Sequence, residues 1–338
     1  MKVWFFALFP LFLFALHYEN RGFVHLLTVE PENYIFKIGL AQDNGLGVET
    51  TSSMAKRLGA IAAINGGFFE DESGAYIGAS AGSLKIAGTY FSTCRKERGV
   101  IGWNDGREPI IDRLSLKPSI DGHLVDKFNG QRNPSDVVLF SWPFHRHTLT
   151  QAGGVEYALS PDGTIIGISS SGNMKIPENG YVLSVGPTAH FPKFQLHSSV
   201  EIAFKASDAK WNFLDNIMDG TPVLIQNGRP VENYDTEKVI ETFITKPHPR
   251  SAVGIKKNGD WVFVVAEGRR EKFPGLTLKD LTDLMLNLGC TDALNLDGGG
   301  STTLFYDGLV RNTPADMNYQ GIPKERPVAN CILVFPKK

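Results

Sequence analysis

Cysteine is scarce in this chain, and long uncharged runs are almost absent. The 338 residues include only three cysteines, Cys94, Cys290 and Cys331, whose spacing fits neither a disulfide framework nor a zinc knuckle. Cys290 and Cys331 lie beside or within apolar segments, so we expect both to pack as small buried side chains. Cys94 stands among polar residues and is the candidate exposed thiol. At most one disulfide bond could form.

Clusters of one charge are also lacking. The 34 lysines and arginines nearly balance the 36 aspartates and glutamates, and no basic stretch carries interleaved aromatic residues. The densest basic segment, GRREK at 268–272, is typical of the polar end of a strand. Because nucleic-acid binding requires a basic surface, we expect no nucleic-acid partner.

One uncharged run does occur, directly at the N-terminus. Lys2 is followed by Val3 to Leu16 without a charge, the pattern of an export signal. As a helix this run would reach about 21 Å, short of the roughly 30 Å of a bilayer core. We therefore interpret residues 1–20 as a signal peptide. No small-x-small cleavage pair precedes Glu19, so an uncleaved N-terminal anchor is the alternative, and the membrane would be contacted only through it. Both readings predict an exported protein, periplasmic or extracellular.

The remaining residues, 21–338, contain no low-complexity linker and predict one large domain. Three turn dipeptides, each between β-branched runs, predict hairpins: Asp162-Gly163, Asn227-Gly228 and Asn258-Gly259. The expected fold class is α+β, with a large twisted, mainly antiparallel mixed β-sheet rich in hairpins and flanked by a few helices.

Two helices are predicted, at 51–58 and at 278–288. The second has Thr277 as its N-cap, Gly289 as its stop and one apolar stripe, which indicates packing on the core. The stripe consists of Leu278, Leu281, Leu284, Met285 and Leu288.

The same pattern follows both helices: leucine-glycine, a short apolar strand, then a polar residue and glycines. It reads RLGAIAAINGGFF up to Phe69 and NLGCTDALNLDGGGSTTLF up to Phe305. Each strand delivers its polar residue at its C-terminal end, so we expect the Asn65 and Asp297 turns to close two sides of one cleft. Recurrence of ordinary capping rules is an equally good explanation of the repeat.

The second turn carries the strongest functional signal. Asp297 is followed by three glycines and three hydroxyl residues, although glycine weakens an ordinary strand. Glycine lets a ligand approach main-chain N–H groups, so this segment predicts a ligand-facing turn with Asp297 at its tip. An Asp-Gly pair alone would be a common turn.

Five segments in order carry a family resemblance: AINGGFF at 63–69, FNGQR at 128–132, PRSAVGI at 249–255, NLDGGGSTTLF at 295–305 and ERPVANCILVF at 325–335. Together they resemble the phosphodiester glycosidase domain, from about Val24 to the C-terminus. The resemblance implies that Asn65, Asn129, Arg132, Arg250 and Asp297, with Gly298, Gly299, Gly300, Ser301 and Thr302, occupy the positions of the family's pocket. One departure is Glu267 in VVAEGRR, where an aspartate is expected.

Breaking a glycosyl phosphodiester at its C–O bond requires a stabilised oxocarbenium-like sugar and a place for the departing phosphate. We assign Asp297 to stabilise or attack the anomeric carbon, with Glu325 as a second carboxylate. The planar guanidinium group of arginine binds two phosphate oxygens at once. The candidates for contact with the phosphate are Arg132, Arg250 and Arg326. Arg326, next to Glu325 in sequence, fits a salt bridge equally well.

The remaining assignments concern binding. The glycine N–H groups with Ser301 and Thr302 would hold phosphate, while Asn65, Gly66 and Asn129 would contact the sugar. Thr148 would contribute a hydroxyl near the cleft. Retention or inversion depends on the distance between two carboxyl groups, which sequence does not supply.

Metal binding has one weak candidate. His145 and His147 alternate as on a strand, but no third ligand is evident, so we predict no zinc and no other cofactor. Calcium stays open, because scattered oxygen ligands leave little trace in a sequence.

The predicted function is a hydrolase that cleaves the glycosyl C–O bond of a sugar-1-phosphodiester, with an envelope or extracellular glycan as its substrate. Two alternatives remain: a non-catalytic glycan-binding or assembly protein of the envelope, and a phosphodiesterase that cleaves P–O.

Overall fold

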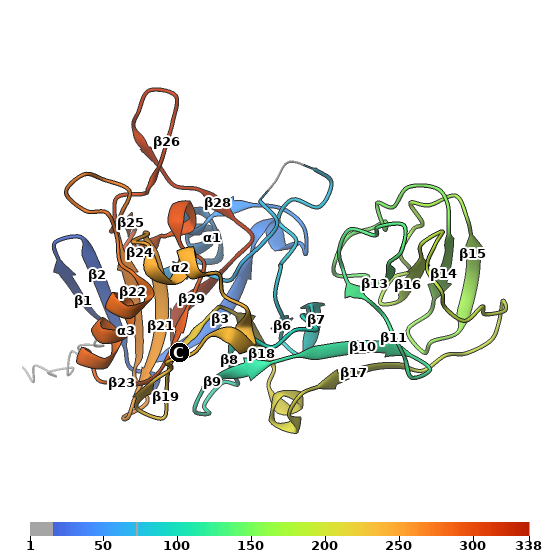
Figure 1. The fold of residues 1–338 in the computed structure, drawn as a ribbon, viewed down its shortest axis with the longest axis horizontal. Coiled ribbons are helices and arrows are strands. Elements are labelled where there is room, and N and C mark those ends of the chain that lie inside the picture. The colour runs from blue at the N-terminus through green and yellow to red at the C-terminus, as the bar shows by residue number, and fades with distance from the viewer. Residues whose placement is uncertain (1–15, 72–73, 338) are drawn as a thin grey trace, which may run out of the picture.

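The computed structural model describes residues 16–71 and 74–337, and strands dominate this part of the chain (Figure 1). Every strand pairing in it is antiparallel except that of β12 with β13. Few helices accompany the sheets. The predicted α+β class, mainly antiparallel with a few helices, is confirmed.

A seven-stranded sheet forms one side of the larger part of the molecule, which we call the main lobe. Its order is β1 (Leu16–Arg21), β2 (Val24–Val29), β22 (Trp261–Ala266), β21 (Arg250–Lys256), β23 (Cys290–Asn295), β19 (Val223–Gln226) and β20 (Arg229–Pro230). Its central strands are buried on both faces, since alternate residues of β22 join two different apolar clusters. The sheet therefore holds the C-terminal end of β23 rigidly.

Two five-stranded sheets complete the main lobe. One has the order β25 (Leu309–Val310), β24 (Leu304–Tyr306), β5 (Ala62–Asn65), β29 (Asn330–Pro336) and β3 (Tyr34–Leu40). The other has the order β7 (Thr89–Ser92), β6 (Leu84–Ile86), β18 (Asn216–Asp219), β8 (Arg98–Trp103) and β9 (Ile110–Leu114). One apolar cluster contains residues of all three sheets, so the main lobe has a common core.

A third five-stranded sheet lies apart, at the right of Figure 1, and we call it the distal lobe. Its order is β12 (Lys127–Phe128), β13 (Val137–Ser141), β16 (Tyr181–Val185), β14 (Val155–Leu159) and β15 (Ile165–Ser169). The long strands β10 (Leu116–Ile120) and β17 (Ile202–Ala206) pair with each other and connect the lobes, with β11 (His123–Leu124) at their edge.

Short elements complete the fold. The remaining strands are β4 (Glu49–Thr50) with β28 (Pro327–Val328) and β26 (Asp316–Met317) with β27 (Pro323–Lys324). The 3-10 turns are η1 (Ala41–Asp43), η2 (Ala209–Phe213), η3 (Asp235–Glu237) and η4 (Gly299–Ser301).

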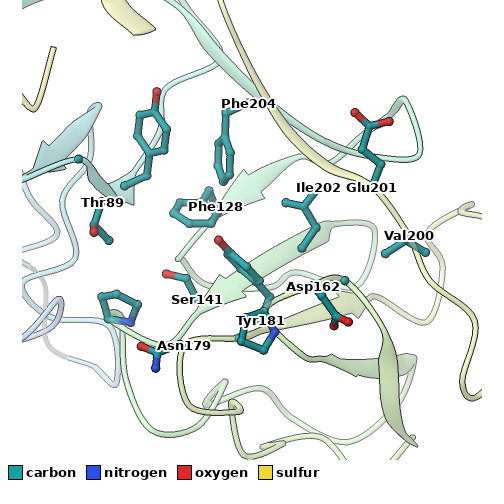
Figure 2. A pocket seen from close by; sticks show the side chains of 16 residues that line it. Thr89, Phe128, Ser141, Asp162, Asn179, Tyr181, Val200, Glu201, Ile202 and Phe204 are labelled. Carbon is teal, nitrogen blue, oxygen red and sulfur yellow. The ribbon is translucent and has the colours of Figure 1, made fainter. Parts of the chain in front are cut away.

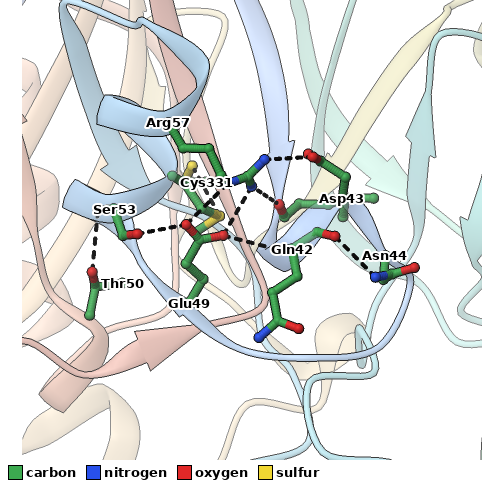
Figure 3. A network of polar contacts seen from close by, with 10 residues as sticks. Gln42, Asp43, Asn44, Glu49, Thr50, Ser53, Arg57 and Cys331 are labelled. Carbon is green, nitrogen blue, oxygen red and sulfur yellow. Dashed lines mark hydrogen bonds and ion pairs between the residues drawn. The ribbon is translucent and has the colours of Figure 1, made fainter.

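The two predicted helices are confirmed. α1 (Thr51–Leu58) begins at Thr50, whose side chain accepts from the Ser53 N–H, and ends at Gly59 with φ 74°. Glu49 and Asp43 bind Arg57 and tie the helix to the η1 segment (Figure 3).

α3 (Leu278–Asn287) has a complete capping box of Thr277 and Asp280, and its apolar stripe packs on the seven-stranded sheet, as predicted. A third helix, α2 (Glu241–Thr245), is short.

All three predicted hairpins are present. They are β14–β15 around Asp162-Gly163, β19–β20 around Asn227-Gly228, and β21–β22 around Asn258-Gly259. Asn227 and Gly228 have φ values of 51° and 76°, the left-handed pair that a type I′ turn needs. Turn chemistry thus identified these connections correctly.

The described residues begin inside the segment that the sequence assigns to an export signal. Leu16–Arg21 form β1, which pairs with β2 over its whole length. Residues 1–15, which carry most of the apolar run, lie outside the described residues. Within the described chain, no helix is long and apolar enough to cross a membrane. Cys290 and Cys331 are buried, as expected, and Cys94 is partly exposed; all three are free thiols.

Candidate active site

The Asp297 turn, residues 297–302, continues from β23 at the centre of the seven-stranded sheet. The Asp297 N–H donates to the Gly66 carbonyl at 3.1 Å, and the Asp297 carbonyl accepts from Asn65 Nδ2 at 2.6 Å. The Asn65 and Asp297 turns are therefore in direct contact, as the hypothesis of a shared cleft requires. That they close two sides of one cleft stays a prediction.

Asn65 is fully buried, and both ends of its amide are occupied. Besides the Asp297 carbonyl, it contacts the Ser251 hydroxyl at 2.6 Å and the Thr303 N–H at 3.1 Å, both through Oδ1. These bonds position the Asp297 backbone. They leave the amide no free atom for a sugar, so contact of Asn65 with substrate stays a prediction without support from this geometry. Gly66 serves the same junction through its carbonyl.

The Asp297 carboxyl is in an environment that favours its neutral form. Burial raises the pKa of Asp297 to about 6, against the lowering effects of the Ser301 hydroxyl, the Gly298 N–H and the charge of Arg326. Asp71 adds a smaller raising effect on this pKa. A carboxyl that titrates near neutrality can exist in either protonation state under working conditions, as acid–base and nucleophilic catalysis require.

The main-chain N–H groups of the turn are largely committed. The Gly299 N–H donates to the Pro249 carbonyl, and the N–H groups of Ser301 and Thr302 donate to carbonyls within the turn. The Gly298 N–H interacts with the Asp297 carboxyl. Binding of phosphate by the glycine N–H groups remains a prediction. Because Gly298 and Gly299 already donate their N–H groups, Gly300 is the remaining candidate donor. The Thr302 hydroxyl is buried and has no hydrogen-bond partner among the described residues.

Arg326 lies directly against the turn. A side chain at Gly300 would collide with its guanidinium group, so the glycine is what permits the close approach. Arg326 also pairs with Asp316, at 2.7 Å from Nε, and with Asp71 at 3.6 Å. The salt-bridge interpretation of Arg326 is therefore confirmed, and its positive charge acts on Asp297. Contact of Arg326 with phosphate stays a prediction.

A second arginine, Arg269, approaches the same turn. It contacts the Cβ position of Gly299 and pairs with Asp316 at 3.4 Å. Its side chain is half exposed, so it adds positive charge at the surface beside Asp297. No feature of the sequence distinguishes Arg269 from its neighbour Arg270, which pairs with Glu267.

Arg250 points away from the turn. Its guanidinium group is buried and donates to the carbonyls of Leu276, Phe243 and Lys246, and its Cζ lies 4.4 Å from the Phe243 ring centroid. No carboxylate lies within 4.0 Å of it in the described chain, and burial lowers its pKa to about 10. These contacts make Arg250 a clamp on the end of α2, and its proposed contact with phosphate gains no support.

Glu325 is held at the start of α1. Its carboxylate accepts from the Ser52 N–H at 2.8 Å and from the Ser52 hydroxyl at 2.6 Å. A carboxylate in the first turn of a helix is stabilised there. Its assignment as the second catalytic carboxylate stays a prediction, because no contact within the described chain joins it to the Asp297 turn.

Three predicted site residues lie at the distal lobe. The Asn129 amide bonds to the Phe91 carbonyl and to Ser141, and Arg132 donates to the Ser184 hydroxyl and to the carbonyls of Gln151 and Gly153. The Thr148 hydroxyl meets that of Thr150. These side chains organise the distal lobe and are not brought into contact with Asp297.

A buried carboxyl that the sequence analysis missed lies beneath the site. Asp219, at the end of β18, is fully buried, and its side chain fills the space where Gly67 and Gly82 have no side chains of their own. Neither carboxyl oxygen of Asp219 has a hydrogen-bond partner among the described residues. An orphaned buried carboxyl is costly, which makes it a candidate functional group.

Charge couples Asp219 to the site. Burial raises its pKa to about 7; the positive charge of Arg98 and the nearby Phe68 N–H oppose this, and the negative charge of Asp297 adds to it. The signal existed in the sequence, because Asp219-Gly220 follows an apolar strand just as Asp297-Gly298 does.

Arg98 and Asn330 were missed as well. Arg98 Nε is buried without a partner among the described atoms, and its Cζ lies 5.8 Å from the Phe68 ring centroid. Asn330 Oδ1 accepts from the Gly67 N–H at 2.9 Å and so fixes the loop over Asp219.

The remaining sequence signals have structural explanations. Glu267 accepts from the Thr313 N–H at 2.7 Å, pairs with Arg270 and contacts His25 Nε2 at 3.0 Å. His145 Nδ1 contacts the backbone of His147. In residues 16–71 and 74–337, no group of three or more His, Cys, Asp or Glu side chains is arranged to hold a metal ion.

Comparison with known proteins identifies the relatives of this fold. Residues 153–335, more than half of the chain, match the family model described as phosphodiester glycosidase. An uncharacterized protein of Rickettsia conorii is 29% identical over 229 residues, 63% of this chain and 77% of that protein. The N-acetylglucosamine-1-phosphodiester alpha-N-acetylglucosaminidase of Bos taurus is 30% identical over 109 residues, 30% of this chain and 20% of the bovine enzyme.

Two solved structures share the fold. A hypothetical protein from Synechocystis superposes with a TM-score of 0.80 and 22% identity, covering 95% of this chain and 61% of that chain. A putative exported protein from Burkholderia pseudomallei superposes with a TM-score of 0.77 and 20% identity, covering 93% of this chain and 74% of that one. The chain thus spans about three fifths of the Synechocystis chain and a fifth of the bovine enzyme.

Proposed function

Since the chain belongs to the phosphodiester glycosidase family, we propose that it is a hydrolase that cleaves the glycosyl C–O bond of a sugar-1-phosphodiester. The observation that carries this proposal is the meeting of Asp297, whose pKa is raised to about 6 chiefly by burial, with the guanidinium group of Arg326 on one glycine turn. An acid with a nearby cation matches the two charges that develop when a glycosyl phosphate ionises.

In the proposed reaction, the bond between the anomeric carbon and the phosphate oxygen breaks, and that oxygen leaves with the phosphate. The Asp297 carboxylate stabilises or attacks the oxocarbenium-like carbon, while Arg326 neutralises the departing phosphate. Water adds its hydroxyl to the sugar. The leaving group is a phosphate monoester that ionises near pH 6, so it needs little protonation.

Asp219 is the second carboxyl in this proposal, in place of a role for Glu325. It is buried within range of the Asp297 charge and titrates near neutrality, so it can hold a proton while Asp297 is ionised. As a buried group it acts through the electrostatics of the site rather than by contact with substrate. Arg98, which also faces it, balances its charge when it ionises.

The proposed substrate is an envelope or extracellular glycan. Three observations support this: the N-terminal pattern of Lys2 and an uncharged run, the label of the Burkholderia pseudomallei neighbour as a putative exported protein, and the glycosyl phosphodiester named in the bovine enzyme.

Isotope incorporation tests the reaction. The benzyl phosphodiester of N-acetylglucosamine 1-phosphate is incubated with the protein in heavy-oxygen water, with the Asp297→Asn variant as the control. We expect the label in the sugar and none from the variant. Label in the phosphate would identify a phosphodiesterase, and binding without any label would identify a non-catalytic glycan-binding protein; either result contradicts the proposal.

A further inference from the structure

A cavity of about 690 Å³ lies apart from the Asp297 turn, where the main lobe meets the distal lobe. Its walls come from β7, β12, β16 and β17 and from the Pro161–Gly163 turn, and it contains no residue of the Asp297 turn. The volume is within the roughly 300–1,000 Å³ of ordinary small-ligand sites.

Aromatic rings line this cavity on several sides. Phe204 stacks on Tyr90 with centroids 4.8 Å apart and meets Phe128 edge-on at 5.0 Å. Tyr181 is different, because its ring has no aromatic partner in the described chain. Figure 2 shows Tyr181 in the middle of the lining residues, between Ser141 and Asp162. One aromatic ring is therefore available to a ligand within a wall of mutually packed rings.

Polar groups without protein partners accompany the rings. Neither the Tyr181 nor the Tyr90 hydroxyl is hydrogen-bonded to another group of the described chain, although both residues are half-buried. The Ser141 hydroxyl accepts from Asn129 Nδ2 at 2.8 Å, so its own proton is free to be donated. The exposed side chain of Asn179 lies at the rim.

The charge of the cavity differs from that of the Asp297 turn. Among the described residues that line it, the only ionisable side chains besides the tyrosines are Asp162 and Glu201, and none is a lysine, arginine or histidine. Lys85 does not line the cavity, although its Nζ lies 5.0 Å from the Tyr90 ring centroid. A phosphate would meet two carboxylates at the wall, which disfavours an anionic ligand.

We propose that this cavity is a binding subsite for a neutral saccharide, a glycan segment of two or three sugar rings. The C–H face of a sugar ring suits the electron-rich face of Tyr181, and its hydroxyls suit the tyrosine and serine hydroxyls and the rim carboxylates. The subsite would hold the uncharged part of a glycan whose phosphate lies elsewhere.

The sheet connects this subsite with the candidate active site. Tyr90 of β7 pairs with Lys85 of β6, Lys85 pairs with Ile217 of β18, and β18 ends at Asp219. Strand pairing therefore links the cavity with the strand that ends at Asp219. The choice of a glycan as the ligand rests on the proposed function, whereas binding at the cavity is tested without turnover at Asp297.

Saturation-transfer NMR on the whole protein tests the subsite. The probes are neutral trisaccharides of glucose, galactose, mannose and N-acetylglucosamine, with choline and glucose 1-phosphate as charged comparisons. We expect at least one trisaccharide to bind and glucose 1-phosphate not to bind here. No binding of any trisaccharide, or binding of choline alone, would refute the inference.

Variants then locate the binding. Tyr181→Ala should weaken trisaccharide binding at least about tenfold, and Tyr181→Phe by less, because only one hydrogen bond is lost. Thr89→Trp should block the cavity from an exposed rim position without disturbing the core. Tyr319→Ala, at a tyrosine that is 95% exposed on the β26–β27 hairpin, is the matched control and should bind normally. Unchanged binding in both Tyr181→Ala and Thr89→Trp would overturn the assignment, and retained binding in Asp297→Asn would support the independence of the two sites.

Discussion

The Asp297 turn and the aromatic cavity differ in the side chains that form them. At the turn, Arg326 and Arg269 approach where Gly300 and Gly299 leave room, and both arginines pair with Asp316. In the cavity, aromatic rings and two carboxylates form the wall, and none of its described lining residues is a lysine, arginine or histidine. The comparison leads to a two-part proposal: phosphate binds at the arginine-flanked turn, and the uncharged part of a glycan binds in the cavity. The hollow of about 690 Å³ belongs to the cavity, whereas the two acids with raised pKa values, Asp297 and Asp219, belong to the turn and its surroundings.

The largest expected effect is on turnover at the turn. Asp297→Asn keeps the shape of the side chain but removes its charge, so kcat should fall by about 10²–10⁴-fold. Hydrolysis of the benzyl phosphodiester measures this, and circular dichroism confirms that the variant folds. Near-normal turnover in a folded variant would remove Asp297 from the mechanism.

Arg326→Gln should lower kcat/KM by about 10²–10³-fold, because the departing phosphate loses its cation. Arg311→Gln is the matched control. Its guanidinium group packs 5.2 Å from the ring centroids of Tyr18 and Tyr306, away from the turn, and its activity should be retained. Equal losses in both variants would mean that Arg326 only stabilises the fold.

Asp219 should make the free energy of unfolding depend on pH. Its pKa is raised to about 7 by burial, and an unfolded aspartate ionises near 3.9, so the folded state holds this proton more tightly. Its contribution is therefore favourable at low pH and is lost as the pH rises from about 4 to about 7. The full difference is about 4 kcal/mol.

Asp219→Asn removes this pH dependence. At pH 8 the free energy of unfolding of the variant should exceed that of the wild type by up to about 4 kcal/mol, with a smaller gap at pH 5. Urea denaturation at the two pH values measures the gap. If the Asp219→Asn variant is more stable than the wild type but loses turnover, Asp219 serves function at a cost in stability. If Asp219→Asn is less stable than the wild type at pH 8, the claim that a buried, unpaired Asp219 carboxylate destabilises the fold is wrong.

The smallest expected effect on turnover comes from changing Arg250. Arg250→Gln should destabilise the protein by about 2–3 kcal/mol, since carbonyls at the end of α2 lose their donor. kcat should change little if the residue is a structural clamp. A large loss of kcat with unchanged stability would restore the phosphate-binding role that the sequence suggested.

Local elements of this fold were readable from the sequence. The caps of α1 and α3 and the three turn dipeptides follow from short-range rules. The contact of the Asn65 and Asp297 turns joins residues 232 positions apart, and it was predicted from the repeated pattern instead. The repeated pattern is informative too. Asn65 and Asn295 stand at the same place in it, and each is a fully buried amide that binds main-chain carbonyls.

Side-chain direction was harder to predict. Glu325 bonds to Ser52, 273 residues away, and Arg250 turns toward α2, because sheet register and helix placement decide these contacts. Asp219 was missed because it stands out only through its burial without a hydrogen-bond partner. That burial depends on the space left by Gly67 and Gly82, which lie far from Asp219 in the sequence. Residue types in the sequence pointed to the turn, whereas only the packing revealed the buried Asp219 that we propose as the second carboxyl.

A crystal structure of the Asp297→Asn variant soaked with the benzyl phosphodiester of N-acetylglucosamine 1-phosphate tests the central claim most directly. The account predicts the anomeric carbon within about 3–3.5 Å of the side chain at position 297 and the phosphate against Arg326. A ligand whose phosphate lies away from Arg326, with its anomeric carbon out of reach of position 297, would contradict it.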